Sequence, residues 1–546
     1  MQTVQQERSG GQLIVAALEA QGLERVFCVP GESYLDLLDA LHDSAIAVTV
    51  ARQEGGAAMM AEAWGKMTGR PGVALVTRGP GATNAASGVH VAQQDATPLV
   101  LMVGQVGRDM RGRDAFQEVD YQALFGGMAK WVAEIDDVAR IPELISRAWH
   151  TAMAGRPGPV VLSLPQDMLV ERCALAPPPR IALSDPAPAG DDLARLAEAL
   201  RVAQRPMIVA GGSRWDSAAC KALDQVAARW QIPVASTFRR QTLIDNCHPS
   251  YAGELTIGAN PALLALLRES DLTLLIGDQM SEIPSQGYAL YDIPCTETRL
   301  VHVHPGPEEL GRVYTAWLGI AATPGAFLTG WAGLVAPKAP VWAERTPAAH
   351  AAYLEWSQPV GGDLMTRLMA FLNARLASET IVTNGAGNYA IWVQRFRRYP
   401  GPGSHLGPAS GSMGYGLPAA IAAKLRHPAR PVLCFAGDGC LQMTIQELAT
   451  AAQDGAAIKV IVVDNRQYGT IRAHQARDYP GRRSATALKN PDFAALARAY
   501  GFVAWTAATL DALDTGLNAL LAESGPALLH VLTDPDQIAP GRRLTA

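Results

Sequence analysis

The sequence predicts an α/β protein built from three doubly wound parallel-sheet domains. Short runs rich in Val, Ile and Leu alternate with longer amphipathic stretches, a pattern typical of βαβ units. The chain has 546 residues, more than one hydrophobic core usually organises. Proline-rich stretches at Ala174–Gly190 and Ala336–Ala349 favour extended linkers, because proline fixes φ and cannot donate a hydrogen bond. We therefore expect a domain in each of residues 1–173, 191–335 and 360–546.

In the first segment, short β-branched runs predict strands, and the amphipathic stretches between them predict helices. The strands are expected within residues 25–31, 45–53, 71–81 and 98–106, and the helices within 34–43, 54–69 and 82–95. Because each strand is followed by a helix that can return the chain, we expect these strands to be parallel.

The middle and third segments repeat this rhythm. Strands are expected within residues 205–212, 231–237 and 271–278, and then within 379–385, 431–439, 458–465 and 526–534. A helix is expected over 444–453, with Ile445, Leu448 and Ala452 on its apolar face. The first and third segments match in size and rhythm, but no internal repeat is strong enough to establish a duplication.

Composition narrows the class of function. The chain is 49% hydrophobic and 18% charged, with a net charge of −5, so it has an ordinary globular composition and no basic surface for nucleic acid. Its seven cysteines are scattered and never in CxxC spacing, which favours neither a zinc site nor a disulfide framework. The N-terminal residues lack a signal-peptide apolar region, and no apolar run approaches the roughly 18 residues of a membrane span. We expect a cytoplasmic enzyme that acts on small molecules.

Polar residues end two neighbouring strands of the third segment. Asp438 lies within Gly-Asp-Gly after one strand, and Asn465 ends the next strand, 27 residues later. Parallel strands place ligands at their carboxyl ends, so both side chains are expected to reach one ion. A carboxylate, an amide oxygen and a loop carbonyl suit Mg²⁺, and Gly437 and Gly439 allow a diphosphate to approach the backbone. Taken singly, each feature is more often an ordinary turn or cap.

This arrangement resembles the diphosphate and metal motif of thiamine-diphosphate (ThDP) enzymes. The resemblance implies that Asp438, Asn465 and the main-chain oxygen of Gln467 bind the metal. It also implies a pyrimidine-binding first domain, a central α/β domain and a diphosphate-binding third domain.

Five further segments resemble the acetolactate-synthase-like branch of that family. They are residues 411–423, 52–69, 76–89, 114–120 and 384–392. The first of them implies that Met413 is the bulky residue under the cofactor, and the second that Glu54 is the cofactor-activating glutamate. The cofactor contacts that the resemblance implies are Glu54, Gly387, Asn388, Tyr389, Gly411, Met413, Gly437, Asp438, Gly439, Cys440, Asn465, Tyr468, Gly469 and Thr470.

The chemistry implied for these residues is physically consistent. In this family a carboxylate, here Glu54, shares a proton with the pyrimidine, and burial raises a carboxylate pKa toward the value that this requires. A large, conformable apolar side chain such as Met413 can hold the two cofactor rings in a V. Gly411 lets a main-chain carbonyl approach the pyrimidine. Each also has a plainer explanation, since Glu54 alone would suit a helix N-terminus and Met413 alone would suit a core.

The substrate pocket departs from biosynthetic acetolactate synthases. A carboxylate, Glu32, stands where those enzymes carry a second glycine, and we assign catalytic roles to Glu54, Glu32 and Gln117. Thr470 and His474 stand where those enzymes have Met and Trp, which makes the pocket more polar. Lys130, His405 and His474 have no assigned role, because each also fits a surface or satisfied polar group.

The sequence thus predicts a ThDP- and Mg²⁺-dependent lyase or carboligase. It would decarboxylate a pyruvate-like 2-oxo acid and transfer the acyl-anion equivalent to a second carbonyl compound. The resemblance further implies a homodimer or homotetramer with active sites between subunits. Alternatives are an FAD-linked ThDP oxidase, a 2-hydroxyacyl lyase, or a non-catalytic ThDP-binding relative. FAD binding is disfavoured but stays open as an alternative, because the flavin-contacting segments of the family are not visible in the middle segment. The absence of a His-His pair disfavours a simple decarboxylase.

Overall fold

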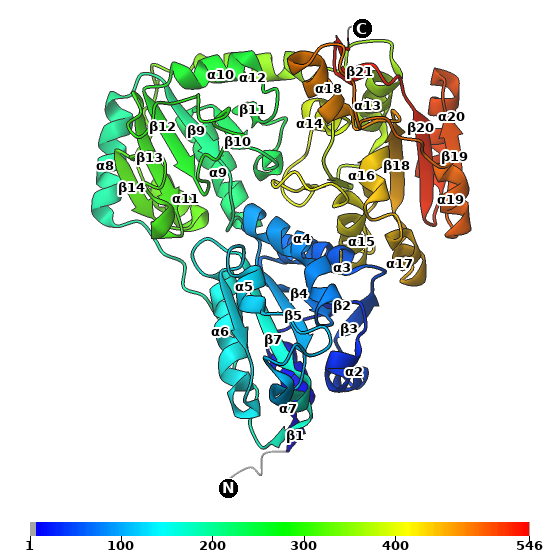
Figure 1. Ribbon diagram of the computed structural model, residues 1–546. Helices are drawn as coiled ribbons and strands as arrows, with labels where there is room; N and C mark the ends of the chain where they lie inside the picture. Colours follow the sequence, from blue (N-terminus) through cyan, green and yellow to red (C-terminus); the bar gives the residue numbers. More distant parts are fainter. Residues whose placement is uncertain (1–6, 545–546) are drawn as a thin grey trace.

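The computed structural model describes residues 7–544 and contains three parallel six-stranded sheets flanked by helices (Figure 1). This confirms the predicted fold class. The domain boundaries remain a prediction, and residues 1–6 and 545–546, which the predicted first and third domains include, lie outside the described part of the chain. No helix within residues 7–544 is long and apolar enough to cross a membrane.

The first and third sheets share one strand order. In the first sheet the order is β3 (Ala47–Val50), β2 (Arg25–Cys28), β4 (Gly72–Val76), β5 (Leu99–Gln105), β7 (Pro159–Pro165) and β6 (Trp131–Glu134). In the third it is β16 (His405–Leu406), β15 (Ile381–Asn384), β17 (Val432–Gly437), β18 (Lys459–Asp464), β20 (Ala527–Leu532) and β19 (Val503–Ala507). Counted within each sheet, both read 2-1-3-4-6-5, so the structure reveals a relation that the sequence did not.

The middle sheet is wound differently. Its order is β11 (Tyr251–Leu255), β10 (Val234–Thr237), β9 (Pro206–Ala210), β12 (Leu272–Ile276), β13 (Arg299–His304) and β14 (Leu318–Ala321). This reads 3-2-1-4-5-6, the order found in dinucleotide-binding folds. Helices α8 (Gly190–Val202), α9 (Ser217–Trp230), α10 (Pro261–Arg268), α11 (Pro324–Ala332) and α12 (Arg345–Trp356) belong to this part of the molecule.

The first and third sheets are joined through their helices. Helix α3 (Glu54–Thr68) packs against α15 (Gly416–Arg426), and both contribute to one hydrophobic core. The neighbouring helices α4 (Pro80–Asp95) and α17 (Glu447–Gln453) flank this contact (Figure 1). The other helices near the first sheet are α1 (Gly10–Ala20), α2 (Leu35–His42), α5 (Tyr121–Phe125), α6 (Ile141–Met153) and α7 (Gln166–Val170).

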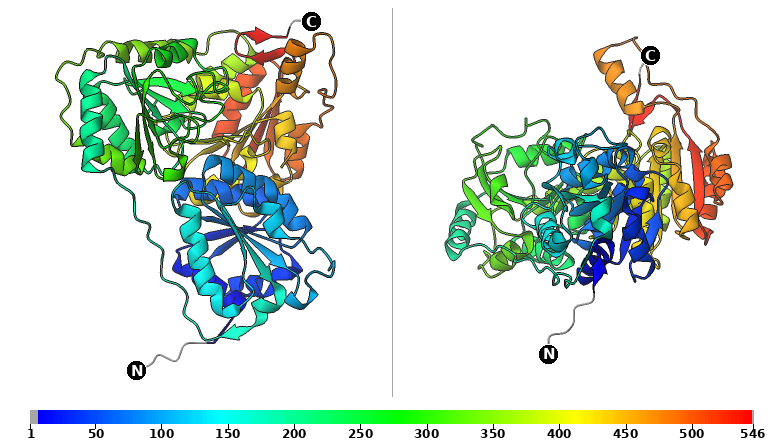
Figure 2. Two further views of the ribbon diagram at one scale, coloured as in Figure 1. Left: turned by 60° about the vertical axis from the view of Figure 1, so that its left-hand side comes forward. Right: turned by 60° about the horizontal axis from the view of Figure 1, so that its bottom comes forward.

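The remaining elements complete the third domain and the termini. Helices α13 (Leu364–Arg375), α14 (Ala390–Phe396), α16 (Asp438–Gln442), α18 (Gly469–Asp478), α19 (Phe493–Ala499) and α20 (Leu510–Ala522) surround the third sheet. Strands β1 (Arg8–Ser9) and β8 (Arg172–Cys173) form an antiparallel pair, as do β21 (Gln537–Ala539) and β22 (Arg542–Arg543). Figure 2 shows that α18, in orange, stands out from the body of the molecule.

Two local predictions were wrong. The helix expected over 444–453 begins only at Glu447, because the Thr444 hydroxyl donates to the Gly414 carbonyl (2.7 Å) and holds a turn between α16 and α17. The stretch Ala336–Ala349 is not extended throughout, since α12 begins at Arg345. Pro347 is tolerated there because it lies in the first turn, where its nitrogen needs no helical acceptor. The other stretch, by contrast, runs without helix or strand from Ala174 to Ala189 along the outside of the molecule (Figure 2).

Candidate active site

The predicted diphosphate corner lies where the third sheet reverses its winding, between the carboxyl ends of β15 and β17. Ligands bind at this switch point in doubly wound sheets. Asp438 begins α16 directly after β17, and Asn465 directly follows the adjacent β18. Both are nearly buried, with 4% and 6% of their surfaces exposed. The fold therefore brings the two predicted side chains to one edge of one sheet.

Three residues that the sequence analysis did not identify hold Asp438 in place. The Asn490 amide donates to Asp438 Oδ2 (2.7 Å) and to Asp464 Oδ1 (2.9 Å), and His530 Nε2 lies 3.0 Å from Asp464 Oδ2. Burial raises the pKa of Asp438 to about 7. Burial opposes ionisation of Asp464 as well, but hydrogen bonds led by that of His530 outweigh it and lower the Asp464 pKa.

Glycines around this corner let neighbouring side chains approach the backbone so closely that an added Cβ would clash with them. A Cβ built on Gly469 would lie 2.4 Å from Asn388 Oδ1 and 2.8 Å from Asn465 Nδ2. One on Gly437 would lie 2.6 Å from the Tyr389 ring, and one on Gly439 would lie 2.7 Å from the Tyr468 ring. The predicted residues Asn388, Tyr389, Asn465, Tyr468 and Gly469 thus converge on a glycine-lined cradle.

Beneath the cradle, Tyr389 and Cys440 tie the loops together. The Tyr389 hydroxyl donates to Cys440 Sγ (3.2 Å) and accepts from the Gly385 amide (3.1 Å). The Gly414 amide also donates to Cys440 Sγ (3.2 Å). The Cys440 sulfur therefore accepts two hydrogen bonds from other protein groups. Met413 and Gly411 lie on the loop before α15. Met413 is half-buried against a hydrophobic core of the third domain.

The donor set at this corner fits Mg²⁺ with a diphosphate. No group of three or more His, Cys, Asp or Glu side chains suited to a metal occurs in residues 7–544. A magnesium ion held with a diphosphate needs fewer charged ligands, because it keeps phosphate and water oxygens. The carboxylate of Asp438, the amide oxygen of Asn465 and the carbonyl of Gln467 are hard-oxygen donors of that kind. The Gln467 amide donates to Asn465 Oδ1 (3.3 Å), which places these two residues side by side.

Glu54 lies in the first domain, at the first position of α3. Asn84, on α4, donates to Glu54 Oε2 (2.9 Å). The segment before Glu54 is anchored to the third domain, since the Arg52 amide donates to Glu447 (3.2 Å). Within the described residues no hydrogen bond or ion pair joins Glu54 to Asp438, Asn465 or the 384–389 loop. Within one described chain, Glu54 and the cradle are therefore not connected by a hydrogen bond or an ion pair.

Glu32 and Gln117 lie at the corresponding switch point of the first sheet. Arg78, which follows β4 and is 7% exposed, connects the segments that carry them. Its guanidinium donates to Glu32 Oε1 (2.7 Å), to the Phe116 carbonyl (3.2 Å) and to Gln166 Oε1 (3.0 Å). Gln117 adopts a φ of 64°, and its Cβ would lie 2.9 Å from one built on Gly79. Arg78 thus fixes the position of Glu32 and of the Gln117 loop together.

The residues without an assigned role lie in different places. Lys130 precedes β6, at the amino edge of the first sheet, and donates to the Ala154 carbonyl (2.7 Å). His405 is buried with its Nε2 2.7 Å from Asn384 Oδ1, and burial lowers its pKa well below the usual value. His474 is exposed on α18, as is Thr470. Of these, Lys130 lies at the edge opposite to the candidate site.

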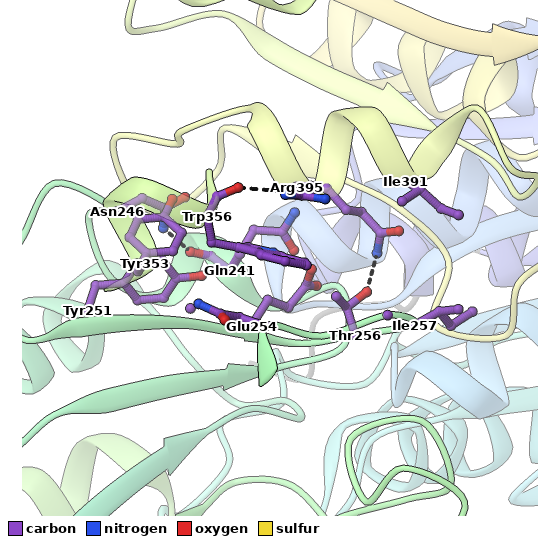
Figure 3. A pocket seen from close by; sticks show the side chains of 14 residues that line it. Gln241, Asn246, Tyr251, Glu254, Thr256, Ile257, Tyr353, Trp356, Ile391 and Arg395 are labelled. Carbon is purple, nitrogen blue, oxygen red and sulfur yellow. Dashed lines mark hydrogen bonds between the residues drawn. The ribbon is translucent and has the colours of Figure 1, made fainter. Parts of the chain in front are cut away.

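A cavity of about 30 Å³ lies between the middle and third domains (Figure 3). Gln241, Glu254 and Trp356 line it, and both polar atoms of the Gln241 amide lack a protein partner among the described residues. This volume suits one or two buried waters. It is distinct from the cradle, although Ile391 and Arg395 on α14 contribute to its wall.

The residues that sequence reasoning missed gave little local signal. Asp464 directly precedes Asn465, so its position was visible but its partners were not. Asn490 lies in a loop and His530 on β20, and only tertiary packing brings Asn490 to Asp438 and His530 to Asp464. Arg78 lies in the Thr-Arg-Gly-Pro-Gly segment after β4. Its positive charge was the only local feature that could have pointed to a role at the site.

Comparisons with known proteins agree with this arrangement. Family models of thiamine pyrophosphate enzymes match residues 8–124 (N-terminal TPP binding domain), 193–330 (central domain) and 385–531 (C-terminal TPP binding domain). The probable acetolactate synthase large subunit of Methanocaldococcus jannaschii is 31% identical over 98% of this chain and 94% of its own. The acetolactate synthase isozyme 2 large subunit of Escherichia coli strain K12 is 29% identical over 96% of both chains. The isozyme 1 large subunit of the same strain is 30% identical over 97% of this chain and 94% of its own. The chain therefore belongs to the thiamine-diphosphate-dependent enzymes, in the branch that resembles acetolactate synthase large subunits.

Proposed function

We propose that the protein is a ThDP- and Mg²⁺-dependent carboligase that decarboxylates a pyruvate-like 2-oxo acid and transfers the acyl-anion equivalent to a second carbonyl compound. The observation that carries this proposal is the glycine-lined cradle at the sheet edge where the buried Asp438 and Asn465 follow neighbouring strands. Support for the reaction class comes from the relatives that are named acetolactate synthases. All seven cysteines are unpaired, which suits a reducing compartment such as the cytoplasm.

Each part of the chain has a distinct task in this proposal. Asp438, Asn465 and the Gln467 carbonyl would hold Mg²⁺ and the diphosphate, while Met413 would support the cofactor rings. When bound, ThDP supplies the nucleophilic carbon and the electron sink for decarboxylation. Glu54 would share a proton with the cofactor pyrimidine, and Asn84 orients the Glu54 carboxylate through its hydrogen bond. Glu32 and Gln117, positioned through Arg78, would face the substrates and set acceptor preference.

We further propose a homodimer or homotetramer in which Glu54 of one subunit serves the cradle of another. Glu54 and the cradle lie on different domains and do not contact each other within the described chain. Near each half, large apolar side chains are exposed: Phe116 (74%) on the first domain, Met443 (49%) and Ile471 (54%) on the third. A second copy would cover them and complete the site.

Substitution of Glu54 by Gln tests the catalytic proposal directly. The variant keeps its hydrogen bond to Asn84 but cannot share a proton with the pyrimidine, so exchange of the ThDP C2 proton should slow at least ~10²-fold while ThDP still binds. Exchange is measured by proton NMR in heavy water, and binding by titration. An unchanged exchange rate would contradict the role of Glu54.

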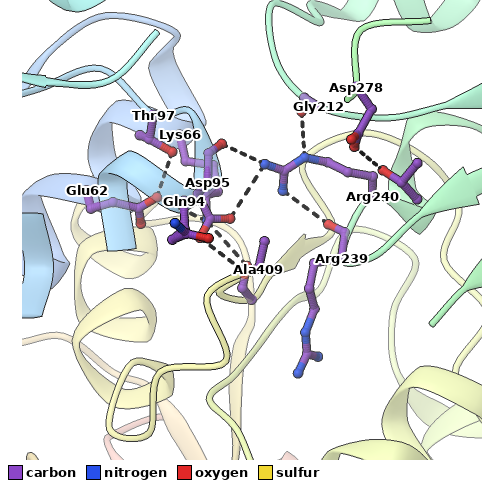
Figure 4. A network of polar contacts seen from close by, with 12 residues as sticks. Glu62, Lys66, Gln94, Asp95, Thr97, Gly212, Arg239, Arg240, Asp278 and Ala409 are labelled. Atoms are coloured by element: carbon purple, nitrogen blue, oxygen red, sulfur yellow. Dashed lines mark hydrogen bonds and ion pairs between the residues drawn. The ribbon is translucent and has the colours of Figure 1, made fainter. Parts of the chain in front are cut away.

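A flavin-linked oxidase is the second candidate, because the middle sheet has the strand order of dinucleotide-binding folds. At the carboxyl ends of its strands, however, protein groups hydrogen-bond to one another. Thr237 donates to Asp278 Oδ2 (2.5 Å). Arg240 donates to the Gly212 carbonyl (2.6 Å), as Figure 4 shows. A flavin absorption band in the purified enzyme would favour the oxidase, and full carboligase activity in a flavin-free preparation would exclude it.

A further inference from the structure

A second cavity lies far from the switch points, at the opposite ends of the helices that join the first and third domains. Its volume is about 330 Å³, within the range of small-molecule sites. Arg70 lies just beyond the C-terminus of α3, and Arg426 is the last residue of α15. Arg180 enters from the extended linker. Three separate parts of the chain thus each contribute a guanidinium to one space.

The position of Arg180 is fixed by contacts on both sides of it. The Gln21 side chain, which is 1% exposed, donates to the Pro179 carbonyl (2.9 Å) and accepts from the Ile181 amide (2.8 Å). These two bonds pin the linker where Arg180 points across Gly22. The main chain on both sides of Arg180 is therefore held in place, while Arg180 itself is exposed.

Charge in this cavity is unbalanced. Among the residues that line it, Arg70, Arg180 and Arg426 are opposed by the single carboxylate of Glu24, which lies 3.6 Å from Arg426. Burial and the nearby Arg180 charge both lower the pKa of Arg70. This excess of positive charge in the cavity contrasts with the net charge of the whole chain, which is −5. An anion between the guanidinium groups would relieve their repulsion.

Helix ends account for two of the arginines but not for the third. Cations are favourable near helix C-termini, and Arg70 donates to the Gln21 carbonyl (3.2 Å) at the end of α1. Arg180 belongs to no helix and makes no hydrogen bond to another described residue. Converging guanidinium groups are the usual means of holding a phosphate, because their paired N–H groups match its oxygens.

We propose that this cavity binds a phosphate-bearing small molecule and couples it to the cofactor. The coupling follows from the helices. Helix α3 is roughly 22 Å long at 1.5 Å per residue, so Glu54 stands at one end and Arg70 at the other. Helix α15 likewise runs from the Met413 loop to Arg426. A ligand that draws Arg70 and Arg426 together acts on the packing of these two helices.

The binding test uses the enzyme loaded with ThDP and Mg²⁺ in phosphate-free buffer. Inorganic phosphate is titrated calorimetrically, with chloride at matched ionic strength as the reference. Wild type should show saturable binding, and Arg180→Ala should weaken it at least ~10-fold, as expected for loss of a charge-assisted bond. Arg268→Ala, which removes an exposed arginine on α10, is the matched control and should bind as wild type. Absence of saturable binding, or equal weakening in both variants, would overturn the proposal.

Two further measurements separate this site from the diphosphate corner. Crystals soaked in tungstate, a heavy analogue of phosphate, should show an anomalous peak beside Arg70 and Arg180; a peak only at the Asp438 corner would count against the site. Phosphate should also change the ThDP dissociation constant by the same factor as ThDP changes that of phosphate, and Arg180→Ala should abolish this effect. Unchanged ThDP affinity in wild type would refute the coupling. Neither readout depends on the proposed carboligase reaction.

Discussion

At the scale of single residues, the cradle depends on what its glycines lack. Gly469 begins α18 between Asn388 and Asn465, and its missing side chain is what allows those two amides to approach. Asp438 and Asn465 supply polar atoms at this corner, and the glycines let the surrounding side chains approach the backbone closely. A substitution that adds only one methyl group at such a position therefore acts on the geometry of the site without changing its charge.

We expect Gly469→Ala to weaken ThDP binding in the presence of Mg²⁺ at least ~10-fold, because its Cβ would displace Asn388 or Asn465, 2.4 and 2.8 Å away. The dissociation constant is measured by fluorescence or calorimetric titration. Gly127→Ala is the control, since a Cβ there meets nothing within 4 Å. Wild-type affinity in the Gly469 variant would show that the cradle is not the diphosphate site.

The sequence predicted the polar residues of this corner because they lie within short motifs at strand ends. It did not predict that Asn490 bonds to Asp438 or that His530 contacts Asp464, since both pairs come together only through folding. The same holds for Arg78, whose three acceptors lie on three separate segments. Residues that bind a ligand are thus marked by local pattern, whereas residues that position them are distributed.

At the scale of helices and strands, the strands that were predicted are mostly buried on both faces, although the equally buried β7 and β11 were not predicted. Strands β4, β5 and β18 are almost wholly buried and read as continuous apolar runs. Strand β19, with exposed Val503 and Thr506, gave no such signal. The helix expected over 444–453 was wrong at its start because a long-range bond from Thr444 competes with helix formation, and the sequence gives no sign of that partner.

Strand β13 carries a buried histidine that should make stability depend on pH. His302 is 4% exposed, with Nε2 2.8 Å from the Asp278 carbonyl, and burial lowers its pKa from 6.5 to about 4. Below pH 6.5 the unfolded chain therefore binds a proton that the folded chain does not. Stability should fall as pH decreases from about 6.5 to 4, by up to ~3 kcal/mol, and level off below.

Urea unfolding of the middle domain across this pH range measures the effect. His302→Asn should show a shallower loss of stability than wild type between pH 6.5 and 4, although carboxylates contribute a common decline at the acid end. His42→Asn, which changes an exposed histidine at the end of α2, should behave as wild type. Parallel profiles for wild type and His302→Asn would remove this residue as the cause.

At the scale of the whole molecule, a charged network joins the three domains (Figure 4). Lys66 lies 3.1 Å from Glu62 and 2.9 Å from Asp95, whose side chains are fully buried, and Arg240 of the middle domain lies 3.5 Å from Asp95. The Ala409 amide of the third domain donates to the same carboxylate (2.9 Å). Asp95 is therefore the point at which all three domains meet.

Lys66→Met should destabilise the protein by about 3–5 kcal/mol, because it leaves buried carboxylates without their cation. The shift in the urea midpoint measures the loss. Lys221→Met removes an exposed lysine on α9 and serves as control. A Lys66 variant as stable as that control would mean that Arg240 alone balances the network.

Mixing two inactive variants tests the shared site. If Glu54 of one subunit serves the cradle of the other, Glu54→Gln and Asp438→Asn chains that exchange at a 1:1 ratio form mixed dimers with one intact site. About a quarter of wild-type activity should then return, given random pairing of two-site dimers. Activity is assayed before and after subunit exchange. No recovery despite exchange, shown by mass spectrometry of the mixed species, would place both residues of each site in one chain.

The common winding of the first and third sheets bears on the origin of the molecule. Two sheets with the order 2-1-3-4-6-5, packed through equivalent helices, are what a duplicated and fused ancestral unit would leave. In the proposed mechanism, the third domain would provide the diphosphate loops and the first domain the carboxylate of Glu54. An active site formed between two copies of the ancestral unit would then have existed before the two units were fused. Each present-day chain would still need a second subunit to complete that site.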